Sequence, residues 1–143
     1  MRIRRLNHSI YRVQYHIVWC TKYRRQWLKH YVRTELIKSV YQVLKANPAW
    51  YLHQINTADD HVHMRLEFPP DISIAQAVQK MKAHSSAHIR KTFKFIDKIY
   101  PDQGIWSRGY FASTIGLDED MIGKYIQLQN DYDKGVDVTA EFE

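Results

Sequence analysis

The chain has 143 residues, one cysteine and a formal net charge of +6. That length suits one domain with a substantial core, so we treat residues 1–143 as a single domain with one functional site. The apolar stretches are far shorter than the roughly 20 residues that cross a bilayer, and no apolar segment follows the basic start, which argues against a membrane protein and against secretion. Cys20 cannot form an internal disulfide, in keeping with a reducing compartment, by default the cytoplasm.

Charge is divided unevenly along the chain. Residues 1–34 contain nine Lys or Arg and no Asp or Glu, whereas the segment from residue 117 onward holds eight acidic residues against two lysines. The cationic segment predicts a polyanionic partner, although a solvated basic face on an ordinary protein is the plain alternative. Aromatic residues lie between the cations and favour nucleic acid, because exposed rings stack on unpaired bases. The sequence predicts no role for the acidic tail from about residue 131.

The first half of the chain predicts three strands and one helix. Apolar residues alternate over residues 13–19, which is the period of a half-buried strand. They then recur at every fourth position from Leu28 to Leu44, which predicts a helix that ends before Pro48. Residues 50–57 and 61–68 predict two further strands, joined by a tight turn as in a hairpin.

The second half predicts a long helix, a fourth strand and a last helix. Ser73 and Gln76 form an S-x-x-Q capping box, so a helix begins there and continues to about Phe93. The stretch that follows is ambiguous, and residues 106–116, rich in aromatic and hydroxyl groups, predict a strand. Acidic residues at 118–120 suit the start of a helix that ends near Gly135. This order predicts an α+β ferredoxin-like βαββαβ fold, an antiparallel sheet with helices on one face, plus a C-terminal helix.

The third predicted strand carries an H-x-H motif. Side chains alternate across a strand, so His61 and His63 share one face with Arg65 and Glu67, while apolar residues occupy the other face. The two histidines stand about 6–7 Å apart along the strand, a separation from which both rings can reach one divalent ion. With eight histidines in 143 residues, the motif also arises often by chance, and two surface histidines are the alternative.

Two further pairs of residues share a helix face. Tyr125 and Gln129 are four apart in the last helix; a phenol there can be a nucleophile and an amide oxygen a metal ligand, but a packed tyrosine and a solvated glutamine explain the pair equally simply. His84 and His88 are four apart in the helix before it and form a rival metal pair. No glutamate supplies the H-E-x-x-H pattern of a zinc hydrolase, which favours solvated or phosphate-contacting histidines.

Several segments together resemble the single-tyrosine HUH transposases of the smallest bacterial and archaeal insertion sequences, the IS200-like group. The resemblance covers about residues 11–130. It is carried by "YHIVWCTKYRR" at 15–25, "DHVHMRLEFPP" at 60–70, "MKAHSSAHI" at 81–89, "WSRGYFASTIG" at 106–116 and "IGKYIQLQ" at 122–129. His84 departs from the smaller or basic residue that relatives often have there, and the tail after Asp131 matches nothing in the pattern.

The resemblance implies a transposase that cleaves and rejoins single-stranded DNA through a 5′-phosphotyrosine intermediate. It makes Tyr125 the catalytic tyrosine, His61 and His63 two metal ligands, and Gln129 the third. Two neutral imidazoles and one amide leave the charge of the ion uncompensated, so we expect Mg²⁺ or Mn²⁺. The resemblance also implies recognition of DNA hairpins near the element's ends and a homodimer whose active site is shared between subunits. His16 and Lys124 are considered as proton acceptors, without geometric support from the sequence.

Basic residues are expected to hold the DNA backbone, a role that positions DNA without reading its sequence. They are Arg4, Arg5, Arg12, Lys22, Arg24, Arg25, Lys80, Lys82, Arg90 and Lys91. Two alternative functions stay open. One is a non-catalytic ferredoxin-like protein that binds nucleic acid or regulates; the other is a domesticated HUH nickase. The complete set of two histidines, a tyrosine and a glutamine favours the transposase, because a binding module has no need of it.

Overall fold

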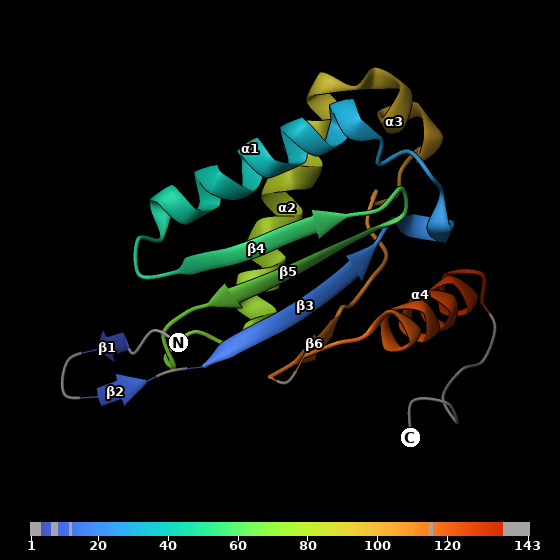
Figure 1. Ribbon diagram of the computed structural model, residues 1–143. Helices are drawn as coiled ribbons and strands as arrows, with labels where there is room; N and C mark the ends of the chain where they lie inside the picture. Colours follow the sequence, from blue (N-terminus) through green and yellow to red (C-terminus); the bar gives the residue numbers. More distant parts are fainter. Residues whose placement is uncertain (1–3, 7–8, 12, 115, 136–143) are drawn as a thin grey trace.

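The computed structural model describes residues 4–6, 9–11, 13–114 and 116–135, with the backbone alone for residues 4–6 and 9–11. Its main body is a four-stranded sheet with helices on both sides (Figure 1). The elements are β1 (Arg4–Leu6), β2 (Ser9–Tyr11), β3 (Gln14–Cys20), η1 (Lys22–Arg24), α1 (His30–Ala46), β4 (Tyr51–Thr57), β5 (His61–Glu67), α2 (Ile74–Thr92), α3 (Lys94–Ile99), β6 (Phe111–Ser113) and α4 (Glu119–Asp133).

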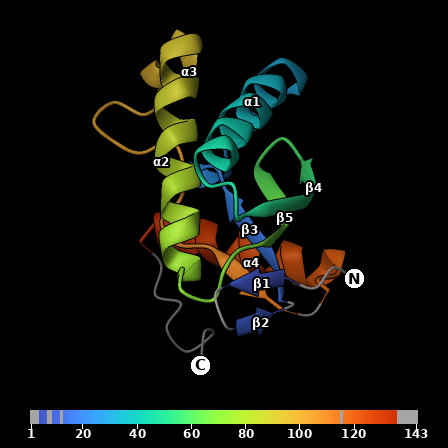
Figure 2. The same ribbon diagram turned by 90° about the vertical axis from the view of Figure 1, so that its left-hand side faces the viewer.

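The sheet has the strand order β4-β5-β3-β6, and all of its neighbouring strands are antiparallel. Two helices, α1 and α2, lie side by side over one face, and α4 lies against the opposite face near β3 and β6 (Figures 1 and 2). This is the ferredoxin-like order predicted from the sequence, with the C-terminal helix added. The prediction of the fold class is therefore confirmed.

Alternation along the two central strands decides which side chains reach the helical layer. Ile17 and Trp19 of β3 are buried in the main core, which β5 joins through Val62, Met64 and Leu66. Val18, which lies between Ile17 and Trp19, points the other way and belongs to a smaller cluster beneath α4. Since His63 pairs with Val18 across the two strands, the histidines of β5 lie on the face that α4 covers in part.

Both long helices begin and end where their sequences predicted. In α2 the backbone N–H of Gln76 donates to the Ser73 hydroxyl over 3.1 Å, and the Gln76 side chain accepts from the Ser73 N–H over 3.2 Å, which completes the capping box. Helix α1 ends at Ala46, two residues before Pro48. The capping box and the apolar period thus fix the layer that supports the sheet.

Three segments differ from the sequence prediction. Residues 4–6 and 9–11 pair as a small antiparallel two-stranded sheet, β1–β2, whose strands are too short to show a period. The stretch judged ambiguous contains the helix α3. The fourth strand was predicted over residues 106–116 but pairs as a strand only over Phe111–Ser113, preceded by an isolated bridge between Thr21 and Trp106. Between them the chain turns away through Gly109, which has a positive φ of 80°.

Many of the interleaved aromatic rings of the N-terminal third are in the core. Trp19 and Trp27 are buried, and the indole N–H of Trp27 donates to the Tyr100 hydroxyl over 2.8 Å. These two rings are therefore unavailable for stacking on bases. Across the described ranges, no helix is long and apolar enough to span a membrane.

Candidate functional site

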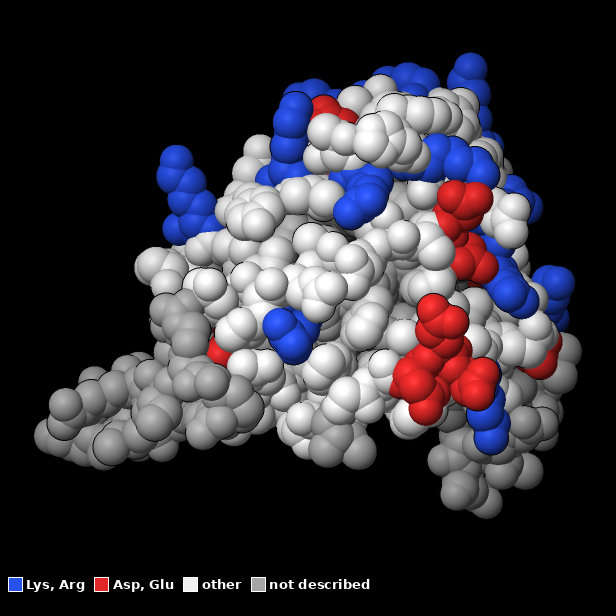
Figure 3. All heavy atoms as spheres, viewed as in Figure 1, with Lys and Arg blue, Asp and Glu red and all other residues white. Residues whose placement is uncertain are grey.

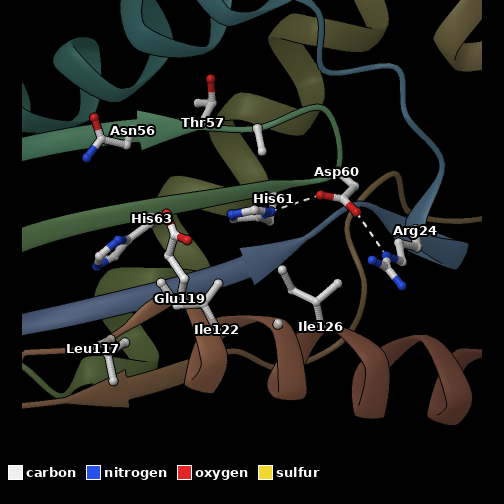
Figure 4. Close-up of a pocket in the computed structure, with 12 residues that line it drawn as sticks. Arg24, Asn56, Thr57, Asp60, His61, His63, Leu117, Glu119, Ile122 and Ile126 are labelled. Atoms are coloured by element: carbon white, nitrogen blue, oxygen red, sulfur yellow. Dashed lines mark hydrogen bonds and ion pairs between the residues drawn. The ribbon is translucent and has the colours of Figure 1, made fainter.

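An open pocket of about 570 Å³ lies where the β4–β5 turn, η1 and the start of α4 meet. Figure 4 shows the two β5 histidines along one side and Glu119, Ile122 and Ile126 of α4 along the other. The lining residues are Arg24, Asn56, Thr57, Ala58, Asp60, His61, His63, Leu117, Glu119, Ile122, Gly123 and Ile126. The structure therefore places the predicted histidine pair together in one pocket.

His61 is held from behind by a carboxylate. Its Nδ1 donates to Oδ1 of Asp60 over 2.8 Å, and the second oxygen of Asp60 accepts from Nε of Arg24 over 3.0 Å (Figure 4). Asp60 is only 8% exposed. The hydrogen bond from His61 holds the pKa of Asp60 below its usual value, with Arg24 acting in the same direction against the effect of burial. An ionised Asp60 accepts only, so the hydrogen of this contact is on Nδ1 of His61.

His63 has a histidine neighbour on the adjacent strand. Its Nε2 lies 3.4 Å from Nδ1 of His16 on β3, a contact in which either ring can be the donor. Burial lowers the pKa of His63, and the neighbouring rings of His16 and His61 lower it further. Burial and then Arg65 lower the pKa of His16. Both rings are thus neutral at pH 7, which is the form of imidazole that binds metal ions.

Arg24 reaches the pocket from a turn with unusual backbone geometry. Tyr23 and Arg24 have φ values of 60° and 57°, in the left-handed region that residues with a Cβ atom seldom adopt. The Tyr23 N–H donates to a carboxylate oxygen of Asp133 in α4 over 3.2 Å. From this turn the Arg24 guanidinium reaches both Asp60 and, over 3.0 Å, Oε1 of Gln127 in α4. A turn between β3 and α1 therefore links the histidine side of β5 to α4.

Tyr125 lies within the contact between α4 and the sheet, outside the histidine pocket. It is 5% exposed, packs against Phe111 with ring centroids 5.7 Å apart, and belongs to the small cluster with Val18 and Cys20. Burial raises the pKa of its phenol, and the nearby Cys20 and Asp133 add to that effect. In this arrangement the phenol is protonated and shielded from solvent.

Gln129 accompanies Tyr125 and not the histidines. Its Oε1 accepts from the Tyr125 hydroxyl over 3.4 Å, and its Nε2 donates to Asp133 over 3.3 Å. Neither Tyr125 nor Gln129 lines the histidine pocket. Within one protomer, the structure brings His61 and His63 together and brings Tyr125 and Gln129 together, but it does not join the two pairs.

The donors in the histidine pocket suit a divalent ion that also binds oxygen ligands. Two imidazoles line a pocket open enough for a phosphate group, and the ring of one of them, His61, is held from behind by Asp60. Among the residues that the structure describes, no three His, Cys, Asp or Glu side chains stand close enough to form a complete metal site. Any ion bound here would therefore take further ligands from amide, hydroxyl or carbonyl oxygens, from substrate, from water or from another chain.

The rival histidine pair on α2 is tied to α1. Nε2 of His84 lies 2.6 Å from Oε1 of Gln42, and Nε2 of His88 lies 3.8 Å from a carboxylate oxygen of Glu35. As already noted for the described part of the chain, no third potential ligand of these types joins them. The pair bridges two helices, and nothing in its surroundings favours a metal.

Most of the predicted DNA-contacting cations whose side chains the structure describes have partners within the protein. Arg24 bonds to Asp60 and Gln127; Arg25 to the carbonyl of Ile99; Lys80 to Asn47; Lys82 to the carbonyls of Ser107 and Gly109; and Arg90 to Asp97 and the carbonyl of Gln103. Lys22 stacks on Tyr23, and Lys91 is exposed. Arg12 and the acidic tail beyond residue 135 lie outside the described residues, as do the side chains of Arg4 and Arg5. Figure 3 shows cations gathered over the helical layer and acids near α4.

Comparison with known proteins identifies the family. A family model described as "Transposase IS200 like" matches residues 9–129. The chain belongs to the IS200-like transposase family. The transposases for insertion sequence element IS200 of Salmonella typhimurium and Salmonella typhi are each 33% identical over 132 residues, which cover 90% of this chain and 84% of theirs. The ISDra2 transposase TnpA of Deinococcus radiodurans is 27% identical over 123 residues, covering 85% of this chain and 87% of its own.

Two solved structures share the fold of this IS200-like protein. A crystal structure of a proposed transposase from Deinococcus radiodurans superposes with a TM-score of 0.77 at 24% identity and covers 88% of this chain and 97% of its own. A REP-associated tyrosine transposase bound to a REP hairpin gives a TM-score of 0.56 at 13% identity, covering 92% and 74%. Family membership makes the protein a DNA-processing enzyme of the transposase class.

The sequence did not assign two of the pocket residues to the histidine site. Asp60 directly precedes the H-x-H motif and bonds to His61, yet the sequence interpretation gave it no role. Arg24 was predicted only to contact DNA. An acidic residue next to a histidine is the available signal for the first. The second depends on a left-handed turn, which leaves no clear trace in composition or period.

Proposed function

We propose that this transposase cleaves and rejoins single-stranded DNA at insertion-sequence ends through a covalent 5′-phosphotyrosine at Tyr125. The observation that carries the proposal is the histidine pocket, in which His61 and His63 of one strand line the same cavity. Family membership supports the same reaction class. A protein that only binds DNA gains nothing from two imidazoles directed into one open pocket.

At each step of the reaction, the energy of the broken phosphodiester bond is retained in a new bond to the same phosphorus. The phenolic oxygen of Tyr125 attacks phosphorus and forms a new P–O bond, while the bond to the 3′ oxygen breaks and leaves a free 3′-hydroxyl. The phenol loses its proton as it attacks, and the departing 3′ oxygen gains a proton. Attack by a 3′-hydroxyl on the phosphotyrosine reverses these bond changes and rejoins DNA without nucleotide hydrolysis. The protein's part is to orient the phenol and the phosphate for in-line attack.

His61 and His63 are the residues that would hold a divalent ion, with Mg²⁺ or Mn²⁺ as the proposed ions. Such an ion supplies Lewis-acid activation of the scissile phosphate. The pocket contributes orientation: Asp60 fixes the His61 ring, and apolar residues of α4 such as Ile122 and Ile126 limit the space beside it. Cleavage should therefore need a divalent ion and should fail in His61→Ala and His63→Ala.

A homodimer with shared active sites fits the separation of the two pairs. Tyr125 and Gln129 are buried away from the histidines of their own chain, so the reacting phenol must come from a displaced α4 or from a second subunit. We favour the second subunit, with Gln129 as its third ligand. Mixing Tyr125→Phe protein with His61→Ala protein tests this: restored cleavage in the mixture supports sharing, and no cleavage in a verified heterodimer contradicts it.

The proposed partner is single-stranded DNA with hairpin ends, in the cytoplasm. The formal charge of +6 supports a polyanionic partner, as does the gathering of cations over the helical layer. A structural neighbour was solved with a REP hairpin bound to it. Hairpin recognition by the present chain is an inference from those two observations.

Strand cleavage tests the proposal. The purified protein is incubated with labelled single-stranded DNA from the flanks of its own gene, with Mg²⁺ or with chelator. Cleavage at a discrete site that requires Mg²⁺ and His61 is the expected result. Tight binding of the same DNA without cleavage under any of these conditions would instead favour the non-catalytic binding protein. Cleavage without rejoining would favour a nickase.

A further inference from the structure

The histidine pocket contains an ordered chain of contacts that the reaction itself does not explain. It runs from Gln127 on α4, through Arg24 in η1, to Asp60 and then to His61. We propose that Asp60 is a positioning residue for the metal site, which fixes the His61 tautomer, and that Arg24 holds Asp60 in place and couples it to α4. This inference rests on the proposed metal role of His61.

The donor and acceptor count determines the tautomer. A carboxylate can only accept, so the 2.8 Å contact between Asp60 Oδ1 and His61 Nδ1 requires a hydrogen on Nδ1. The neutral ring then has its lone pair on Nε2, the nitrogen away from Asp60. A carboxylate behind a metal-binding histidine fixes the ring orientation and strengthens the ligand, and its loss typically weakens metal binding by about 10- to 100-fold.

The backbone around Asp60 leaves the carboxylate little freedom to move. The carbonyl of Asp60 accepts the Thr21 N–H over 2.9 Å, and the Ala58 N–H donates to the His61 carbonyl over 3.0 Å, which closes the β4–β5 turn. The residue is 8% exposed. The side chain of its neighbour Asp59 is exposed and forms a surface ion pair with Lys29, away from His61. Asp59 is therefore a matched control one position away.

Arg24 is placed by a strained turn. The left-handed backbone at Tyr23 and Arg24 is unfavourable for residues with a Cβ atom, and such geometry persists only where surrounding contacts impose it. Those contacts include the bond from the Tyr23 N–H to Asp133 and the bond from the Thr21 hydroxyl to the Arg25 carbonyl over 2.7 Å. The result is a guanidinium positioned between Asp60 and Gln127, so a change at α4 is transmitted to the group behind His61.

Asparagine at position 60 cannot satisfy both neighbours. His61 Nδ1–H and Arg24 Nε–H are both donors, and each takes one oxygen of the carboxylate. An amide offers one oxygen and one NH₂ group, so Asp60→Asn must leave one donor facing another or force the His61 proton to Nε2. The isosteric substitution therefore tests the electronic argument without removing the side chain.

The experiment measures Mn²⁺ affinity of the full chain by titration calorimetry, with the His61 tautomer read from ¹⁵N histidine NMR of the metal-free protein. We expect Asp60→Ala and Asp60→Asn to weaken Mn²⁺ binding by about 10- to 100-fold, with Asp59→Ala unchanged. We also expect wild-type His61 to carry its hydrogen on Nδ1. The double variant Asp60→Ala, Arg24→Ala should bind Mn²⁺ no more weakly than Asp60→Ala alone, because Arg24 acts through Asp60.

Two results would overturn the inference. One is a hydrogen on Nε2 of His61 in the wild-type protein, which needs no metal to observe. The other is Mn²⁺ affinity of Asp60→Asn equal to that of the folded Asp59→Ala control. If His61→Ala loses Mn²⁺ binding but the Asp60 variants bind Mn²⁺ as tightly as the wild type, the proposed function survives and the positioning role fails. If wild type and His61→Ala bind Mn²⁺ equally, the proposed metal site fails, and this inference fails with it.

Discussion

Replacing Lys82 with methionine gives a quantitative prediction. The ammonium of Lys82 donates to the carbonyls of Ser107 and Gly109 over 2.6 and 3.0 Å, in the loop that leads to β6. Burial lowers the pKa of this lysine from 10.5 to about 8. Met keeps the length of the side chain but removes the charge and both hydrogen bonds. At pH 7 the substitution therefore has two opposed effects on stability, because it removes two hydrogen bonds and also removes the cost of burying a charge. The pH dependence of the difference in stability between the two proteins has a definite sign.

The sign follows from proton binding. Lys82 has a pKa near 10.5 in the unfolded chain and about 8 in the folded one, so between these values the unfolded chain binds more protons. Its contribution to stability is complete above about pH 10.5 and is lost as the pH falls through about 8. At about 1.4 kcal/mol per pKa unit, the full difference is about 3.5 kcal/mol. Between pH 7 and pH 9 we expect the wild type to gain about 1 kcal/mol relative to Lys82→Met.

The assay is urea unfolding of both proteins at pH 7 and pH 9, at equal protein and salt concentrations, followed by circular dichroism. Comparing the two proteins at each pH cancels the other titrating groups, which both of them contain. The burial of the Lys82 ammonium would be refuted if the difference in free energy of unfolding between wild type and Lys82→Met is the same at both pH values. It would also be refuted if the wild type is less favoured at pH 9 than at pH 7. The same variant also tests the prediction that Lys82 contacts DNA: unchanged DNA affinity would leave it a structural role alone.

Three further predictions concern the scaffold and the DNA surface. Ser73→Ala removes the N-cap of α2 and should lower the free energy of unfolding by about 1 kcal/mol in urea titrations, whereas an unchanged midpoint would contradict the capping box. Leu36→Ala, at a fully buried position of α1, should cost about 2–5 kcal/mol, while Tyr41→Ala, 56% exposed on the same helix, should change stability by no more than about 0.5 kcal/mol. Affinity for single-stranded DNA should fall steeply as salt rises, with a slope of about −0.7 in log K against log salt for each phosphate contact; a flat response in a filter-binding series would exclude the basic surface.

The sequence was sufficient for the parts of the site that depend on local periodicity. Alternation along β5 predicted that His61 and His63 share a face, and helical spacing predicted that Tyr125 and Gln129 do. The structure places each pair together. Local spacing cannot say against which surface a helix packs, because that depends on side chains far away in the chain. For this reason local spacing did not predict the separation of Tyr125 from the histidine pocket of its own chain; only the sharing of the active site implied by the family resemblance anticipated it.

Other differences arise from conformations that residue type does not determine. The left-handed turn at Tyr23 and Arg24 occurs without glycine and is imposed by contacts such as that with Asp133. The fourth strand is short because Lys82 holds the carbonyls of Ser107 and Gly109, a contact between residues 25 or more positions apart. Propensity over residues 106–116 favoured a longer strand, and tertiary hydrogen bonds overrode it.

The most direct test of the account is capture of the covalent intermediate on Tyr125. Single-stranded DNA from the gene's flanks is labelled at its 3′ end, incubated with protein and Mg²⁺, and separated on a denaturing protein gel. The account predicts a labelled protein–DNA adduct that maps to Tyr125, is absent in Tyr125→Phe and persists in Tyr41→Phe, while DNA labelled at the 5′ end gives only a free cleaved strand. An adduct that survives in Tyr125→Phe, or one that retains the 5′ label, would contradict it.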